Sequence, residues 1–171
     1  MRLLIALLAL TIALPAAAAP PKKPAPPAST PATKLGEFED WIAAVHEESG
    51  QKVCYAFTYA KRSTPAIAGR DKVVLTVAER ASGRDAVAIA AGFSYAQGAS
   101  VTVQVDNLGL DFYTAQRDAF ARDGKASVAA FEKGAEALAR SPGPHGEVVD
   151  SFSLKGFSAA YAAINKACPA K

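Results

Sequence analysis

Proline dominates residues 19–34, and this composition limits the fold more than any other feature of the sequence. Six of these residues are proline, which fixes φ and has no backbone N–H to donate. We therefore expect no helix or sheet here but an extended polyproline II linker, which rises about 3.1 Å per residue. Lys22 and Lys23 within it could also touch an anionic surface. The folded domain is thereby confined to residues 35–171.

The residues before the linker have the order of a secretory signal peptide. Arg2 is followed by an uncharged apolar run at residues 3–14, by Pro15 and then by a run of alanines. The apolar run is shorter than the ~20 residues that cross a bilayer. We expect cleavage after Ala18, which makes residues 1–18 the signal peptide. The product would be periplasmic or secreted and would keep no integral membrane segment, whereas a membrane anchor or a buried apolar segment is the alternative.

The charge of the predicted domain argues against a nucleic-acid partner. The formal net charge of the whole chain is +3, but four basic residues lie before residue 35. From that residue on, 15 Lys and Arg stand against 16 Asp and Glu, with no basic run or stripe. Nucleic-acid binding depends on such a concentration of positive charge. We therefore predict no nucleic-acid binding.

Two cysteines, read together with the expected export, predict a disulfide bond. Exported proteins fold in an oxidising compartment, where a cysteine pair is more often a bridge than a metal site. Residues 52–61 alternate as a strand that places Cys54 among small side chains, and residues 157–168 form a helical apolar stripe that ends at Cys168. We predict a Cys54–Cys168 bridge between this helix and this strand. Two free buried thiols remain the alternative.

Short alternating segments separated by turns predict a mainly β domain. Residues 100–105 alternate valine with polar residues, and a hairpin turn follows at residues 106–109. Helical patterns occur late, at residues 125–133 and 157–168. Because strands and helices do not alternate, we expect an antiparallel β-sandwich or partly open barrel. The C-terminal α-helix would pack on it, with one short helix before that.

Four segments carry more specific expectations. We interpret residues 38–48 as the first strand and residues 63–69 as a loop. Residues 136–140 are compatible with either a helix or a strand. Residues 141–146 contain two prolines and two glycines and are expected to form a loop.

No combination of side chains predicts catalysis. Ser158 stands between a predicted strand and helix, as in a nucleophile elbow, but no histidine or acidic residue follows it. His46 shares a strand face with Glu48, which is too little for a metal site, and His145 lies in a predicted loop. Two Gly-Arg-Asp sequences, which begin at Gly69 and Gly83, are interpreted as turns. We therefore predict no catalytic residue, no metal and no cofactor.

Three aromatic residues share one face of the strand at residues 52–61. Tyr55, Phe57 and Tyr59 alternate with Cys54 and small or polar residues. Such a face usually belongs to the core. If it is exposed instead, it predicts a surface that binds a partner.

Two motifs resemble the invasion-associated locus B family. Glu39-Asp40-Trp41 followed by Cys54-Tyr55 is similar to the N-terminal signature of that family. Ser153-Leu-Lys-Gly-Phe-Ser-Ala-Ala-Tyr161, continuing to Cys168, is similar to its C-terminal strand-to-helix signature. The resemblance covers residues 35–168, with a single cysteine pair where members often carry more. It implies an exported bacterial protein of a family that is named for host-cell invasion and offers no catalytic residues.

The resemblance implies a non-enzymatic function. We expect an exported protein that binds a protein or an envelope component, in an envelope role as readily as in virulence. An envelope hydrolase or a small-ligand carrier with an unrecognised site is the alternative, and it would require a pocket with clustered ionisable groups. A purely structural or stress-related envelope protein is the third possibility.

Overall fold

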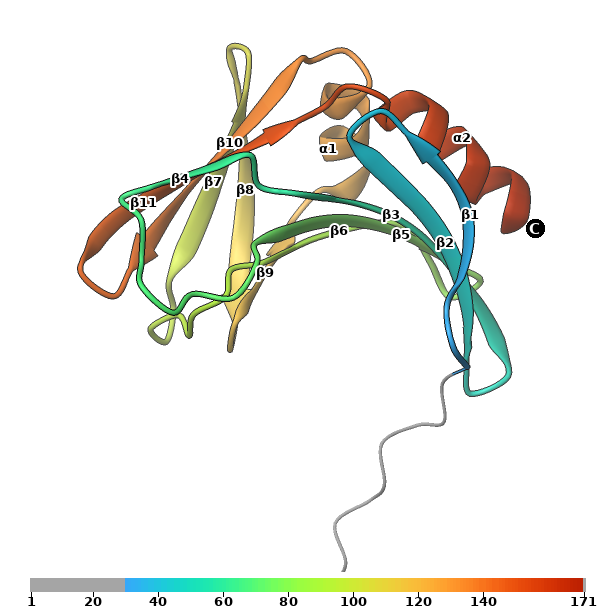
Figure 1. The fold of residues 1–171 in the computed structure, drawn as a ribbon, viewed down its shortest axis with the longest axis horizontal. Helices are drawn as coiled ribbons and strands as arrows, with labels where there is room; N and C mark the ends of the chain where they lie inside the picture. Colours follow the sequence, from blue (N-terminus) through green and yellow to red (C-terminus); the bar gives the residue numbers. More distant parts are fainter. Residues whose placement is uncertain (1–29, 171) are drawn as a thin grey trace, which may run out of the picture.

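The computed structural model describes residues 30–170 of the 171-residue chain. The predicted signal peptide at residues 1–18 and most of the predicted linker lie outside the described residues. The described part forms one antiparallel sheet and two helices, α1 (Gly124–Phe131) and α2 (Phe157–Ala167) (Figure 1). The strands of the sheet are β1 (Thr33–Phe38), β2 (Trp41–Glu48), β3 (Gln51–Tyr59), β4 (Arg62–Thr64), β5 (Val74–Arg80), β6 (Gly83–Ala90), β7 (Ser100–Val105), β8 (Leu108–Ala115), β9 (Asp118–Ala121), β10 (Glu136–Gly143) and β11 (Gly146–Ser153).

The sheet is curled and nearly brings its first strands round to its last. Its spatial order is β1-β2-β3-β5-β6-β9-β8-β7-β10-β11-β4. Strand β3 ends at Tyr59, and after two further residues the same chain enters β4, which pairs with β11 at the opposite edge. A sheet of this width curls because every strand pair adds twist. The prediction of a mainly β, partly open structure with a C-terminal helix is confirmed.

The two helices pack on the same face of the curled sheet, which we call its inner face. Helix α2 buries Phe157, Ala160 and Ile164 against β2 and β3. Asp123 caps the start of helix α1, and its carboxylate accepts a hydrogen bond of 2.9 Å from the backbone N–H of Ala126. Because Asp and Asn side chains satisfy the free N–H groups of a first helical turn, they start helices well.

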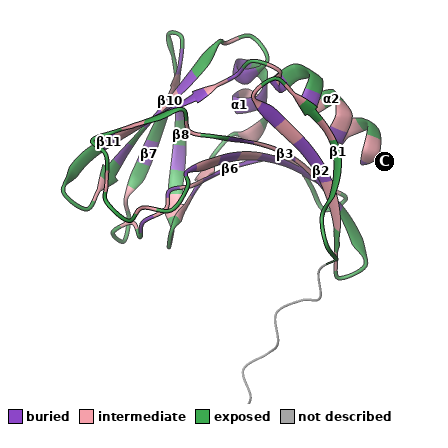
Figure 2. Cartoon of the chain, in the orientation of Figure 1, coloured by how far each residue is buried: buried purple, intermediate pink, exposed green. Residues whose placement is uncertain are grey.

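The core lies between the inner face of the sheet and these helices. Figure 2 shows buried residues along the strands that face the helices, with exposed residues concentrated in the hairpin ends and on the outside of α2. The largest fully buried side chains are aromatic and branched aliphatic residues: Trp41, Phe112, Phe131, Phe152, Phe157, Leu75, Ile89 and Ile164. Burial of such side chains contributes roughly 1.5–3 kcal/mol each.

Several local predictions are wrong in ways that the structure explains. Residues 38–48 form no single strand, because Glu39 adopts φ 51° and turns the chain between β1 and β2. Strand β1 begins at Thr33, inside the range predicted to be unpaired linker. Residues 136–143 form β10 even though Pro142 lies in it. The pairing of β10 with β7 ends at Arg140, so Pro142 lacks a neighbour on that side and no N–H is missed.

Candidate functional site

The predicted disulfide is present in the structure and joins the end of α2 to β3. The Cα atoms of Cys54 and Cys168 are 6.0 Å apart, and 114 residues separate them in sequence. Cys54 lies on the inner face of β3 with Ala56, and the small side chains there allow the helix to approach closely. The bridge therefore closes most of the domain into one covalent loop.

A buried carboxylate lies directly beside the bridge. Glu79 is opposite Cys54 in the β3–β5 pairing and is 0% exposed. Arg84 places its Nε 2.6 Å from Oε2 of Glu79 and donates a 2.6 Å hydrogen bond from Nη1 to the carbonyl of Cys168. Burial raises the pKa of Glu79 to about 7, although the charge of Arg84 opposes the shift. This group thus changes charge near neutral pH.

The same arginine and its neighbour hold the last turns of α2. Arg84 also bonds the side chain of Asn165, and the hydroxyl of Tyr161 donates to the carboxylate of Asp85. Burial, together with the bond to Asp85, raises the pKa of Tyr161 to about 12. The tyrosine therefore stays a hydrogen-bond donor over the physiological pH range. This network is polar but serves to attach the helix.

The other end of α2 is fixed where the two sequence motifs meet. The indole Nε1 of Trp41 donates a 3.0 Å hydrogen bond to the carbonyl of Ser153, and its ring lies 4.8 Å from the ring of Phe157. Gly156 has φ 85°, and a Cβ atom built on it would lie 2.0 Å from the carbonyl oxygen of Phe38. Only glycine fits this close approach. Both motifs are therefore explained by the attachment of α2 rather than by chemistry at an open site.

The predicted aromatic face lies on the opposite side of β3 from α2. Tyr55 and Phe57 are half-buried, and Tyr59 is 43% exposed. The ring centroids are 6.0 Å apart for Tyr55 and Phe57 and 5.7 Å apart for Phe57 and Tyr59, and His46 packs 5.4 Å from Tyr55. We call Tyr55, Phe57 and Tyr59 the aromatic ladder. It forms a continuous apolar row that α2 leaves uncovered.

The outer face continues from the ladder across the neighbouring strands. In register with Phe57 are Thr76 on β5 and then Ala88 on β6. Ala88 pairs in turn with Phe120 on β9, whose ring stacks 5.5 Å from Tyr113 on β8. Tyr113 is 44% exposed. The outer face, which we define as this surface of β3, β5, β6, β9 and β8, thus has small residues between two groups of aromatic side chains.

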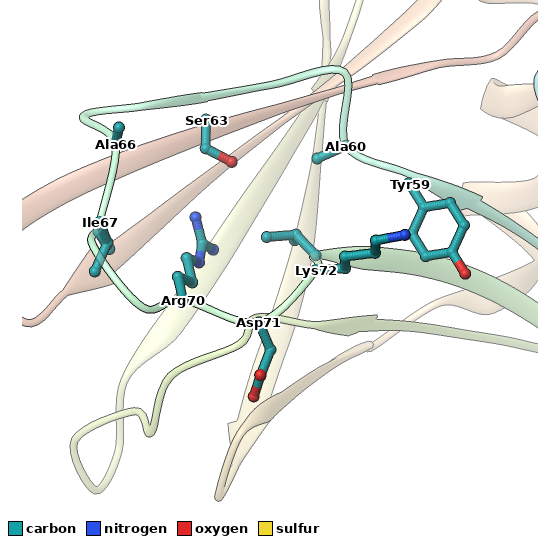
Figure 3. Close-up of a pocket in the computed structure, with 9 residues that line it drawn as sticks. Tyr59, Ala60, Ser63, Ala66, Ile67, Arg70, Asp71 and Lys72 are labelled. Carbon is teal, nitrogen blue, oxygen red and sulfur yellow. The ribbon is translucent and has the colours of Figure 1, made fainter.

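A cavity of about 390 Å³ opens at the Tyr59 end of the ladder (Figure 3). The segment between β3 and β5 encircles it, and Arg70 and Ser63 point into it from that segment. Arg70 is 5% exposed and forms two 2.8 Å bonds with the carboxylate of Asp150, which also accepts a 2.6 Å bond from Ser63. Lys72 lies over the ring of Tyr59, with its Nζ 4.9 Å from the centroid. The arginine here fastens the segment to β11.

The remaining candidate side chains are scattered. Ser158 is exposed on the first turn of α2, whereas His46 lies beside Tyr55, across the sheet from that helix. His145 is exposed at the tip of the β10–β11 hairpin. Within residues 30–170, no three His, Cys, Asp or Glu side chains gather as a metal would require.

Sequence reasoning missed the two buried ion pairs. Both begin in the Gly-Arg-Asp sequences that were interpreted as turns: Arg70 reaches Asp150, and Arg84 reaches Glu79. Gly69 does adopt φ 70°. The arginine that recurs in these two sequences was the signal available for the ion pairs. It could not identify the partner carboxylates, because they lie on other strands.

Comparison with known proteins places this fold in a family. The family profile described as invasion associated locus B (IalB) protein matches residues 41–165. The chain belongs to the IalB family. The match begins at Trp41 and extends into α2, so it includes the contact between Trp41 and Phe157 that holds this IalB domain together.

A solved structure of similar fold comes from Bartonella henselae. The crystal structure of its invasion associated protein B has a TM-score of 0.54 and 17% sequence identity, over 79% of this IalB chain and 97% of that chain. At this identity, the likeness shows a common fold. No curated protein matches the sequence. Neither of the helices described for residues 30–170 is long and apolar enough to span a membrane.

Proposed function

We propose that this IalB-family chain is an exported, non-enzymatic protein that binds a protein or an envelope component through the aromatic ladder. One observation carries the proposal: three aromatic side chains form a row on the outer face, and the helix that could cover them packs on the other side of the strand. Aromatic residues are enriched at binding interfaces because they bury much area with few rotatable bonds.

The expected location rests on the sequence and on the bridge. A signal peptide at residues 1–18 would deliver the chain to the periplasm or the medium. The disulfide between Cys54 and Cys168 is consistent with such an oxidising compartment. Family membership also supports an association with the bacterial envelope.

The ionisable groups support a structural rather than a catalytic use. Arg70 and Arg84 each bind a carboxylate on another element of the fold, so both hold these elements together. A small-ligand carrier would need an open cavity such as the one beside Tyr59. Both terminal nitrogens of the buried Arg70 guanidinium there already bond the carboxylate of Asp150. This pairing favours the ladder over the cavity as the binding surface.

Photo-crosslinking in the envelope of living cells tests the proposal. A photoreactive phenylalanine at Tyr59 should give a discrete crosslinked product, and the same residue at Ala162 on the exposed side of α2 should not. Replacing Phe57 with serine in the Tyr59-labelled protein should weaken that product. Absence of a product at Tyr59 while Ala162 yields one would refute the assignment of the outer face.

A further inference from the structure

We infer that the proline-rich segment before the domain, residues 19–29, docks in cis along the aromatic ladder. This inference rests on the proposed function, because it assigns an occupant to the same face. It adds that the protein's own chain occupies this face. The support comes from the chemistry of the two surfaces, from the point where the segment enters the domain and from its length.

The chemistry of the segment matches the chemistry of the ladder. A proline-rich segment favours the polyproline II conformation, which loses little entropy on binding because it is already extended. Aromatic rows are the surfaces that recognise such segments, because flat rings pack against the pyrrolidine rings. The segment offers five prolines, namely Pro20, Pro21, Pro24, Pro26 and Pro27.

The outer face has room for an extended chain beside the ladder. Between Phe57 and Phe120 lie two strands that present Thr76 and Ala88. Neighbouring strands are about 4.8 Å apart, so the two phenylalanines are separated by roughly 14 Å across a floor of small side chains. An extended backbone lying on this floor would contact aromatic rings on both sides.

The domain fixes the point at which the segment enters. The backbone N–H of Thr30 donates a 3.0 Å hydrogen bond to the carbonyl of Glu47, and the N–H of Glu47 donates a 2.9 Å bond to Oγ1 of Thr30. Glu47 is three residues from Ala44, which pairs with Tyr55. At ~3.3 Å per residue along the strand and ~4.8 Å between strands, Tyr55 lies about 15 Å from this entry point.

The length of the segment is sufficient. Eleven residues of polyproline II extend about 34 Å. After three residues are used to reverse direction, about 25 Å remains, which reaches Tyr55 and Phe57. A short tether also gives an effective concentration in the millimolar range, so that even a weak contact would be substantially occupied.

The test compares three forms of the mature protein by NMR with a soluble paramagnetic agent. The first is the mature chain, the second replaces the five prolines with serine, and the control replaces Lys22 and Lys23 with serine but keeps the prolines. If the tether concentration equals the dissociation constant, about half of the molecules are docked. The ring protons of Tyr55 and Phe57 should then relax about twofold faster in the serine variant than in the other two proteins.

Two results would overturn the inference. Equal relaxation of these rings in all three proteins would mean that the prolines do not cover them. Ring protection that rises with protein concentration would mean that the occupant is a second copy instead. Tyr161, which belongs to α2 and is bonded to Asp85, is the internal reference and should not change.

The two proposals fail separately. If the prolines give no protection but the Tyr59 crosslink persists, docking in cis is wrong and the proposed function stands. If protection is found but no envelope partner is crosslinked even in the serine variant, the docking stands and the proposed function is wrong.

Discussion

The two faces of β3 carry side chains of different size, and they differ in how far those side chains are buried. The inner face presents Cys54, Ala56 and Thr58, which are small and fully or almost fully buried. The outer face presents the aromatic ladder, which is only half-buried. A helix can approach a sheet closely only where the side chains between them are small. The larger residues therefore lie on the side that α2 does not cover, so here size does not predict burial.

Removing the disulfide should give the largest effect on the inner face. In the chain-entropy estimate, a bridge that closes a loop of this size stabilises by about 4–5 kcal/mol. The double variant Cys54→Ala/Cys168→Ala should lose most of that free energy of unfolding, as measured by urea denaturation. A loss below about 1 kcal/mol would mean that the polar bonds of Arg84 hold α2 without the bridge.

Gly156→Ala tests the attachment at the other end of α2. The new methyl group would meet the carbonyl of Phe38 at 2.0 Å in a backbone conformation with φ 85°. We expect a loss of about 2–4 kcal/mol from the positive φ and the overlap together. Ser158→Ala, two residues on and exposed, is the control and should change the free energy of unfolding by less than ~0.5 kcal/mol.

Glu79 should make the inner face sensitive to pH. Its pKa rises from 4.5, the ordinary value of a solvated glutamate, to about 7 in the folded protein. The folded state therefore holds a proton that the unfolded state releases. Stability from this group is fully present below pH 4.5 and is lost as the pH rises through about 7.

Glu79→Gln removes this dependence. The variant should match the wild type near pH 4.5 and exceed its free energy of unfolding by about 2–3 kcal/mol at pH 8, as measured by urea denaturation at both pH values. Equal pH profiles for the two proteins would show that Arg84 keeps the carboxylate charged throughout. The Glu132→Gln variant, with its exposed side chain, serves as the control.

The smallest effect is expected on the outer face. Tyr59→Ser should change the free energy of unfolding by no more than ~0.5 kcal/mol, because the ring is 43% exposed and lies outside the core. The same substitution should weaken crosslinking from a photoreactive phenylalanine placed at Tyr55 if the ladder is the binding surface. A cost of more than about 2 kcal/mol would instead make Tyr59 part of the structural framework.

The sequence allowed some of these features to be predicted, and the reasons differ by element. The alternation of β3 and the helical stripe that ends at Cys168 are local patterns, so the bridge and the two faces of β3 followed from them. Strands β4 and β9 have three and four residues, which is too short for a period of two to stand out. The pairing of Arg70 with Asp150 joins positions 80 residues apart, and no local pattern encodes a partner at that distance.

Helix α2 is the last element of residues 30–170, and it attaches to strands near the beginning of that range. Cys168 lies three residues from the last residue of the sequence. During synthesis or translocation, β2 and β3 therefore emerge long before the element that buries Trp41 and Ala56. A chain that stops even a few residues early would leave these apolar side chains and an unpaired Cys54 accessible to other molecules. The last turn of α2 therefore completes both the core and the covalent loop.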